Sequence, residues 1–182
     1  MNDLKEINVF DVEQGSADGL YRLQQCMNIL SSINVHDNFQ SAAMAFCNEL
    51  ATDYSCERVS LGFSRNNHIE LKAISYTEHF FRKMRLIQNL EYSMEECADQ
   101  DVEILYPAPE QAGCIVHRAA ASLSLHHGPS CILSLPLRKA ESTRAVVTLE
   151  RRSDNEFTHD DVEALRLACE LSTPRLIDLY DF

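Results

Sequence analysis

The spacing of hydrophobic residues changes repeatedly along this chain between the three-to-four-residue step of a helix and the two-residue step of a strand. Helical spacing occurs in residues 20–30 and again in 39–53, where Asp37 is placed to cap the second helix. Residues 56–75 alternate instead, and Arg65-Asn66-Asn67 forms a predicted turn between two strands. Two helices followed by a hairpin exclude a simple βαβ repeat and indicate an antiparallel α+β fold.

The second half of the chain mixes the same two patterns. Residues 77–100 carry one broad apolar helical face, and residues 102–107 form a short extended segment that ends at a proline. An alanine-rich helix is predicted over 113–127. Two strands rich in apolar and β-branched residues follow at 130–137 and 144–151, with Pro136 near an exposed edge.

The last segment is predicted to be a long helix that begins at a capping box formed by Thr158 and Asp161 and is kinked at Pro174. Residues 1–17 are polar, so we expect a flexible leader there and a single domain over 18–182. Since the sequence stops within an apolar helical stretch, we expect it to be part of a longer protein.

Composition narrows the classes of function. There are 16 Lys and Arg against 28 Asp and Glu, a net charge of −12, which would repel nucleic acid or an anionic bilayer. No apolar run is long enough to span a membrane. The seven cysteines are scattered without a C-x-x-C pair, a usage typical of reduced thiols, so we expect a cytoplasmic location.

Several short segments together resemble GAF domains. They are Cys56-Glu-Arg-Val-Ser-Leu-Gly-Phe63, Lys72-Ala-Ile-Ser75, Met94-Glu-Glu-Cys-Ala-Asp-Gln100, Tyr106-Pro107, Leu133-Ser-Leu-Pro-Leu137 and Thr148-Leu-Glu-Arg151 with Phe157-Thr158. The set is most similar to the cytoplasmic GAF domains that precede membrane-fusion, or periplasmic adaptor, subunits of bacterial secretion and efflux systems. This resemblance implies an antiparallel sheet of about six strands, helices packed on it, and a small-molecule-sensing or regulatory role in signal transduction. It also implies that the full-length protein is tethered to the inner membrane.

The resemblance further implies a ligand pocket between the sheet and the third and fourth helices. The side chains expected to line it are Phe63, Ser75, His79, Met94, Tyr106, His117 and Ser134. The alternative is that Phe63 and Met94 pack the core while the polar residues reach solvent. Neither the ligand nor any cofactor is indicated by the residues.

Three other functions have weaker sequence support. Asn155, Phe157 and Asp161 resemble the cyclic-nucleotide signature in spacing, but Glu156 and Val162 depart from it, and helix capping explains the same residues. The candidate ligands for a zinc ion are Cys114, His117, His126, His127 and Cys131. Their spacing fits no known zinc pattern, so no metal is expected.

The remaining alternative is an enzyme similar to free methionine sulfoxide reductases, which are GAF domains with reactive cysteines. Cys97, Cys114 and Cys131 are the candidates, but their spacing differs from that of those enzymes. Acidic residues around Cys97 would also raise its pKa, so we expect packing rather than catalysis. A ligand-free GAF domain that acts only in protein interactions is a further alternative.

The first and last helices favour a homodimer. In the fold that the resemblance implies they lie together, and both carry apolar stripes that could form a four-helix interface. The stripes are Leu20, Leu23, Met27 and Leu30 in the first helix and Val162, Leu165, Cys169, Leu176 and Leu179 in the last. Leu167 and Leu171 lie on a different face of the last helix, which suggests that one face packs on the sheet while the other is free.

Overall fold

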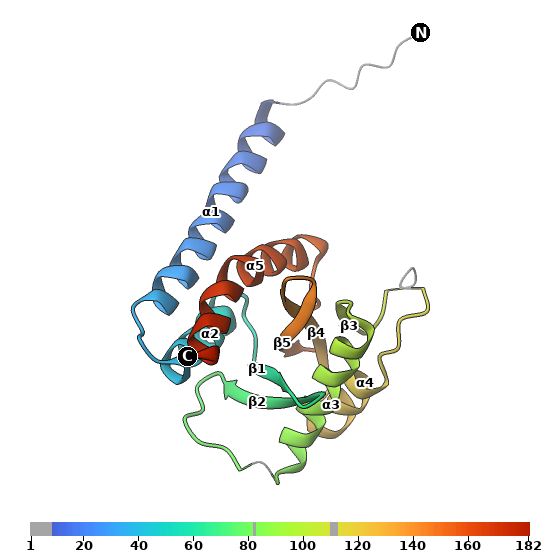
Figure 1. The fold of residues 1–182 in the computed structure, drawn as a ribbon. Helices are drawn as coiled ribbons and strands as arrows, with labels where there is room; N and C mark the ends of the chain where they lie inside the picture. The colour runs from blue at the N-terminus through green and yellow to red at the C-terminus, as the bar shows by residue number, and fades with distance from the viewer. Residues whose placement is uncertain (1–8, 82, 110–112) are drawn as a thin grey trace.

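A computed structural model describes residues 9–81, 83–109 and 113–182, with the side chains of the first helix described from residue 18. Helices and strands alternate irregularly along this part of the chain, as Figure 1 shows. The order is α1 (Val9–Asn34), α2 (Phe39–Asp53), β1 (Arg58–Arg65), β2 (His68–Ile74), α3 (Arg85–Gln100), β3 (Ile104–Tyr106), α4 (Arg118–His127), β4 (Ser130–Lys139), β5 (Ser142–Arg152) and α5 (His159–Asp181).

The strands form one antiparallel sheet in the order β2-β1-β5-β4-β3. The α+β prediction is confirmed, with five strands in the described residues where the resemblance implies about six. The β1–β2 turn lies where the alternation predicts it, and Asn66 and Asn67 have φ values of 51° and 62°. Asparagine tolerates this left-handed conformation, which tight hairpin turns require.

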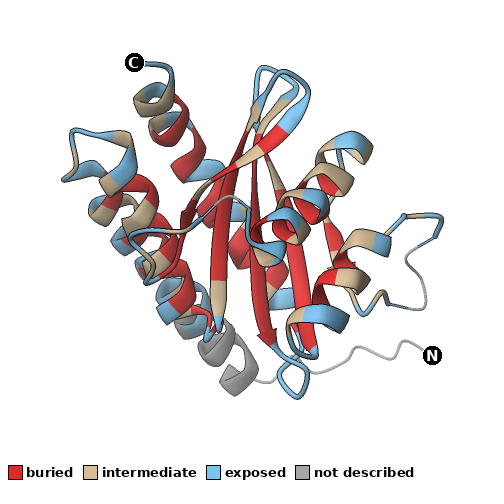
Figure 2. Cartoon of the chain, turned by 90° about the horizontal axis from the view of Figure 1, so that it is seen from below, coloured by how far each residue is buried: buried red, intermediate tan, exposed pale blue. Residues whose placement is uncertain are grey.

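Helices cover both faces of the sheet. One core layer lies between the sheet and α1, α2 and α5, and a second lies between the sheet and α3 and α4. Figure 2 shows the strands as buried ribbons between these two sets of helices. Because both faces are buried, β1 has five consecutive buried residues rather than a clean alternation of buried and exposed ones.

The ends of the helices differ in part from the predictions. The expected leader 1–17 is helical from Val9, and its first eight residues lie outside the described part. Asn38, not Asp37, caps α2, since its Oδ1 accepts a hydrogen bond of 2.9 Å from the Ser41 backbone N–H. Helix α3 begins at Arg85 instead of near residue 77, because Tyr76 has a positive φ and the described residues that follow it, 77–81 and 83–84, are not helical.

Two local predictions at the other end of the chain are confirmed. Thr158 and Asp161 form the capping box at the start of α5. On the side of β4 that faces β3, the described strands leave Pro136 unpaired, because β3 pairs only with Ile132–Ser134. In the described part of the chain, no helix has the length and apolar character needed to cross a membrane.

Candidate functional site

A row of hydroxyl side chains crosses the sheet beneath α3. Ser60 of β1, Thr148 of β5 and Ser134 of β4 are neighbours in the strand pairing, and all three are fully buried. Ser134 Oγ and Thr148 Oγ1 lie 2.8 Å apart and share a hydrogen bond. Ser93, on the buried side of α3, adds a fourth hydroxyl to this layer. A core layer with four hydroxyl groups is polar enough to bind a ligand through hydrogen bonds.

Two of these hydroxyl groups are unsatisfied. Ser60 Oγ and Ser93 Oγ have no hydrogen-bond partner among the described residues, although neither atom is accessible to solvent. A buried hydroxyl without a partner costs about 1–3 kcal/mol, and native proteins contain few of them. The polar layer therefore retains unused hydrogen-bonding capacity.

An ion pair borders the hydroxyl row on one side. Arg58 donates two hydrogen bonds, of 2.6 and 2.7 Å, to the two carboxylate oxygens of Glu150, which is almost completely buried. Burial lowers the pKa of the nearby His127, and the positive charge of Arg58 lowers it further. Arg58 and Glu150 neutralise each other, and the lowered pKa of His127 favours its neutral form.

Met94 fills the opposite side of the row. It is fully buried on α3, and its Sδ lies only 2.6 Å from the point that a Cβ on Gly62 would occupy. Helix α3 can approach β1 this closely because residue 62 has no side chain. A methionine side chain is flexible and adapts to different shapes, so it can fill this space and can also move out of it.

The structure brings some of the predicted ligand-site residues together. Met94 and Ser134 lie in the layer beneath α3. Tyr106 and His117 lie at its margin, with ring centroids 5.9 Å apart. His79 is exposed in the loop before α3, and Ser75 Oγ accepts a hydrogen bond of 3.0 Å from the Val59 N–H, which gives Ser75 a structural role.

The predicted position of Phe63 is wrong. Its ring packs on the opposite face of the sheet, against Phe39 of α2 and Tyr180 of α5, with centroid distances of 5.1 and 4.1 Å. Alternate residues of β1 point to opposite faces, and both faces are apolar because helices cover both. The predicted site does not include Ser60, Ser93 or Thr148. Ser60 and Thr148 could have been noticed, because they are polar positions within apolar strands.

The cysteine and histidine candidates are dispersed. Cys97 lies on the buried face of α3 and donates a hydrogen bond of 3.1 Å to the Val102 carbonyl, whereas Cys131 faces the other core layer and Cys114 is exposed. Burial raises the pKa of Cys97 to about 12 and also raises that of Cys131. Within the described ranges, no three His, Cys, Asp or Glu side chains are grouped so that they could hold a metal ion.

The residues that resemble a cyclic-nucleotide signature lie at the corner between β5 and α5. Asp161 accepts hydrogen bonds from the Thr158 backbone N–H and from Arg151, whose guanidinium lies 4.3 Å from the Phe157 ring centroid. These contacts confirm the capping interpretation, and they lie on the opposite face of the sheet from the hydroxyl row.

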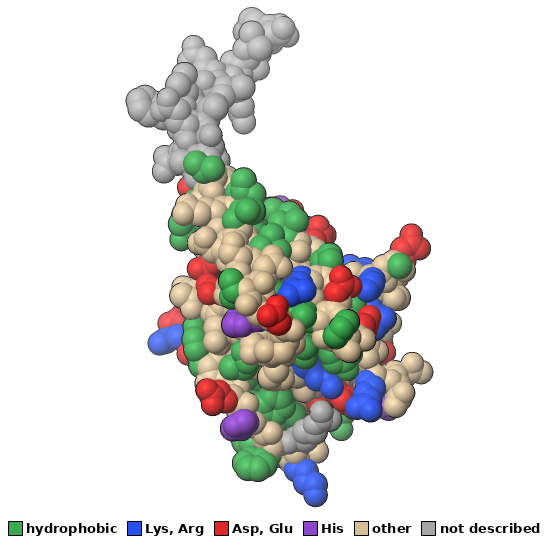
Figure 3. Space-filling model, turned by 60° about the vertical axis from the view of Figure 1, so that its left-hand side comes forward, with side chains coloured by type: hydrophobic (Ala, Val, Ile, Leu, Met, Phe, Trp, Pro, Cys, Tyr) green, Lys and Arg blue, Asp and Glu red, His purple; other side chains and the backbone are tan. Residues whose placement is uncertain are grey.

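The stripes expected to form a dimer interface have different surroundings. Leu20, Leu23 and Met27 of α1 are exposed, and Figure 3 shows hydrophobic side chains along the described part of this helix. The stripe expected on α5 faces inward: Val162, Leu165, Cys169 and Leu176 are buried in the core, and Leu179 packs against it. Leu167 and Leu171, on the face expected to be free, are exposed, whereas the predicted stripe of α5 is not available to a partner.

The fold is that of a GAF domain. The chain is similar to the GAF domain of phosphoenolpyruvate-protein phosphotransferase from Acinetobacter (TM-score 0.66, 13% identity, covering 88% of this chain and 96% of that one). It is also similar to the GAF domain of the potassium sensor histidine kinase KdpD from Escherichia coli (TM-score 0.56, 13% identity, covering 87% and 95%). A third similar structure is free methionine-R-sulfoxide reductase from Neisseria meningitidis in complex with its substrate (TM-score 0.61, 9% identity, covering 88% and 90%).

No model of a protein family matches the sequence, and no curated protein matches it. At identities of 9–13%, similarity to solved structures establishes the fold alone. The function must therefore be argued from the arrangement of residues.

Proposed function

We propose that this chain is a non-catalytic regulatory domain that binds a small, uncharged, polar molecule between α3 and the sheet. The observation that carries the proposal is the pair of buried, unpartnered hydroxyls of Ser60 and Ser93 beside the Ser134–Thr148 pair. A ligand that supplied hydrogen-bond partners would remove the cost of leaving these groups unsatisfied. An uncharged ligand fits best, because Arg58 and Glu150 already neutralise each other.

Movement of the Met94 side chain would let a ligand enter the layer beneath α3. Met94 occupies the space above Gly62, and ligand binding would require its side chain to move and α3 to shift with it. Helix α3 packs on β1, β2, β4 and β5. Its displacement would therefore change the packing of all four strands. A binding event beneath α3 could thus alter the helices on the other face, which is the coupling that a regulatory domain needs.

The enzyme alternative, a reductase similar to the Neisseria protein, would need a reactive thiolate. Cys97 would have to ionise on the buried face of α3, where burial raises its pKa to about 12. Cys131 is on the other face of the sheet, so it could not resolve an oxidised Cys97 by forming a disulfide with it. These positions support a binding role over catalysis.

Native mass spectrometry of freshly purified protein tests the binding proposal. We expect a retained neutral compound in the wild type and its loss in the Ser60→Ala/Ser93→Ala double variant, which should remain folded because it removes only unpartnered hydroxyls. Ser153→Ala, an exposed position, is the matched control and should retain the compound.

A panel of neutral polyols, amides and nucleobases should be screened in parallel by thermal shift. If the wild-type mass is that of the bare chain and no panel compound stabilises it, the binding proposal is wrong. The ligand-free interaction module would then be the better explanation.

We further propose that the domain forms a homodimer through α1 and α5. These helices pack side by side, and a groove of about 530 Å³ between them has apolar walls that include Leu23 and Leu167. Two cationic side chains, Arg22 and Arg166, and two anionic ones, Glu163 and Glu170, also line it. A surface that carries both signs around an apolar centre can be complementary to itself, as a two-fold interface requires. The oligomeric state in solution decides this proposal.

The resemblance to adaptor-associated GAF domains supports a proposal about location, namely the cytoplasmic part of a transport protein tethered to the inner membrane. None of the solved structures named above comes from such a protein. Fractionation of cells that express the tagged native gene provides the test. A product found only in the soluble fraction would contradict the tether.

A further inference from the structure

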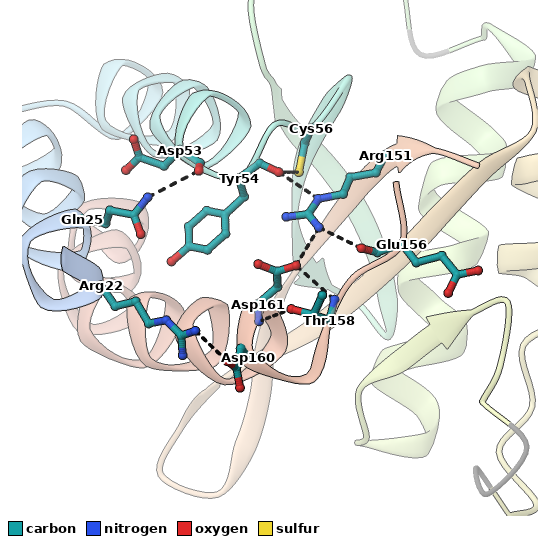
Figure 4. Close-up of polar contacts among 10 residues, drawn as sticks. All are labelled: Arg22, Gln25, Asp53, Tyr54, Cys56, Arg151, Glu156, Thr158, Asp160 and Asp161. Carbon is teal, nitrogen blue, oxygen red and sulfur yellow. Dashed lines mark hydrogen bonds and ion pairs between the residues drawn. The ribbon is translucent and has the colours of Figure 1, made fainter. Parts of the chain in front are cut away.

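A polar cavity lies on the opposite side of the sheet from the hydroxyl row. Its volume is about 470 Å³, it is open to solvent, and it is lined by α1, the end of α2, the end of β5 and the start of α5. Figure 4 shows the polar side chains around it. The side chains that matter for its chemistry are Arg22, Gln25, Asp53, Tyr54, Arg151 and Asp161.

Tyr54 has an unused polar group at this cavity. The residue is only 5% exposed, and its hydroxyl has no hydrogen-bond partner among the described residues. In Figure 4 its ring points away from the strands, and the hydroxyl ends between Gln25 and Arg22. A buried phenol usually has a partner, so this hydroxyl is placed to contact a molecule in the cavity.

Both cationic side chains at the cavity are already paired. Arg22 contacts Asp160 at 2.8 Å across the mouth. Arg151 donates to the carboxylate of Asp161 at 2.8 Å and to the backbone carbonyl of Tyr54 at the same distance. The two guanidinium groups are therefore neutralised and offer little to an anion.

Among the described residues, the carboxylate of Asp53 has no counterion. Its Oδ2 is buried and has no partner among the described residues. Burial raises the pKa of Asp53, and the nearby Glu49 raises it further, as expected for a carboxylate that lacks a positive neighbour. The amide of Gln25 donates to the Asp53 backbone carbonyl at 3.4 Å, so its own side-chain oxygen is a further acceptor beside the cavity.

We propose that this cavity binds a small organic cation with several N–H donors, an alkylamine or a guanidine. Its positive charge would pair with Asp53, and the hydroxyl of Tyr54 would accept one of its hydrogen bonds. This site is separate from the ligand site proposed beneath α3 and does not depend on it. Because α1 forms one wall, an occupant would bridge α1 to α2 and α5.

Isothermal titration calorimetry with putrescine and agmatine tests the proposal. Both should bind the wild type, whereas 1,4-butanediol, which has the shape of putrescine without its charge, and acetate should not. Asp53→Asn should weaken binding by about tenfold or more, the loss expected when a hydrogen bond between charged groups is removed. Asp99→Asn, at an exposed position on α3, should leave binding unchanged.

Tyr54→Phe separates a binding role from a structural one. Removing an unpartnered hydroxyl should leave the melting temperature unchanged or raised, while the affinity for both amines falls. Absence of amine binding in the wild type, equal binding of butanediol, or full affinity in both Asp53→Asn and Tyr54→Phe would overturn the proposal.

Discussion

The contact between Gly62 and Met94 controls how closely α3 approaches the sheet. A Cβ at position 62 would lie 2.5 Å from Ile69 Cγ2 and 2.6 Å from Met94 Sδ, so even one methyl group does not fit without movement. Both neighbouring atoms belong to side chains that are themselves buried. The packing above this glycine therefore determines whether the layer beneath α3 is closed.

We expect Gly62→Ala to lower the free energy of unfolding by about 1–3 kcal/mol, because the added methyl group overpacks the core. Denaturant unfolding measures the change. In a Met94→Ala background the cost should be smaller, because the side chain that opposes the methyl group has been shortened.

Gly19 offers a matched control for that experiment. It lies in α1, and a Cβ there would meet nothing within 4 Å. Gly19→Ala should be neutral or stabilising by about 0.5–1 kcal/mol, since alanine favours a helix. If Gly62→Ala and the wild type have equal free energies of unfolding, a methyl group at residue 62 does not overpack the contact between α3 and β1, and the prediction is wrong.

At the scale of elements, one arginine joins three segments. The side chain of Arg151 is almost fully buried at the end of β5, and it donates to the Tyr54 carbonyl at the end of α2 and to Asp161 in the first turn of α5. It also lies over the ring of Phe157. The start of α5 is thereby fixed to both the sheet and α2.

The Asp161 carboxylate makes this joint dependent on pH. Burial acts to raise its pKa, but hydrogen bonds from Arg151 and the Thr158 backbone N–H outweigh burial and hold the pKa below its usual value. Its stabilising effect is therefore fully present above the unfolded-state pKa of about 3.9 and is lost as the pH falls through the lower folded-state pKa.

We expect Asp161→Asn to reduce the free energy of unfolding by about 1 kcal/mol at pH 7, a typical cost for a damaged helix cap. The difference from the wild type should shrink as the pH falls below about 4. Urea unfolding between pH 7 and pH 3 measures this. As a control, Asp154→Asn removes an exposed ion pair with Arg152 and should change the free energy of unfolding little. If the difference in free energy of unfolding between Asp161→Asn and the wild type stays constant with pH, the prediction is wrong.

At the scale of the whole molecule, the sheet separates the hydroxyl row from the exposed leucines of α1 and α5. Helices α3 and α4 cover the hydroxyl row, while α1 and α5 present exposed leucines on the other side. In the proposed function, a change beneath α3 is transmitted to this apolar surface through the sheet. The proposed dimer interface and ligand site thus lie on opposite faces of one sheet.

We expect the protein to elute as a dimer, and the Leu23→Glu/Leu167→Glu variant to elute as a monomer, because two charges would be buried in the interface. Size-exclusion chromatography with light scattering at micromolar concentration measures the mass. Leu125→Glu alters an exposed leucine of α4 and should remain dimeric. A monomeric wild type would exclude the interface.

The sequence by itself determined the order of elements, the α+β class, the β1–β2 turn and the capping box at Thr158 and Asp161. Each of these depends on residues close together in the chain, whose periodicity and hydrogen-bonding groups act locally. The resemblance to GAF domains named the fold that the tertiary structure then showed.

Only the tertiary structure decided which side of each element faces which neighbour. The alternation along β1 puts Ser60 and Phe63 on opposite faces, but because both faces of the sheet are buried, it does not tell which of the two residues faces α3. Likewise, both Leu165 and Leu167 fit an apolar helix, but packing buries the first and exposes the second. The cavity at Tyr54 joins segments about 100 residues apart, and such contacts leave no periodic signal in the sequence because they form only when the chain folds.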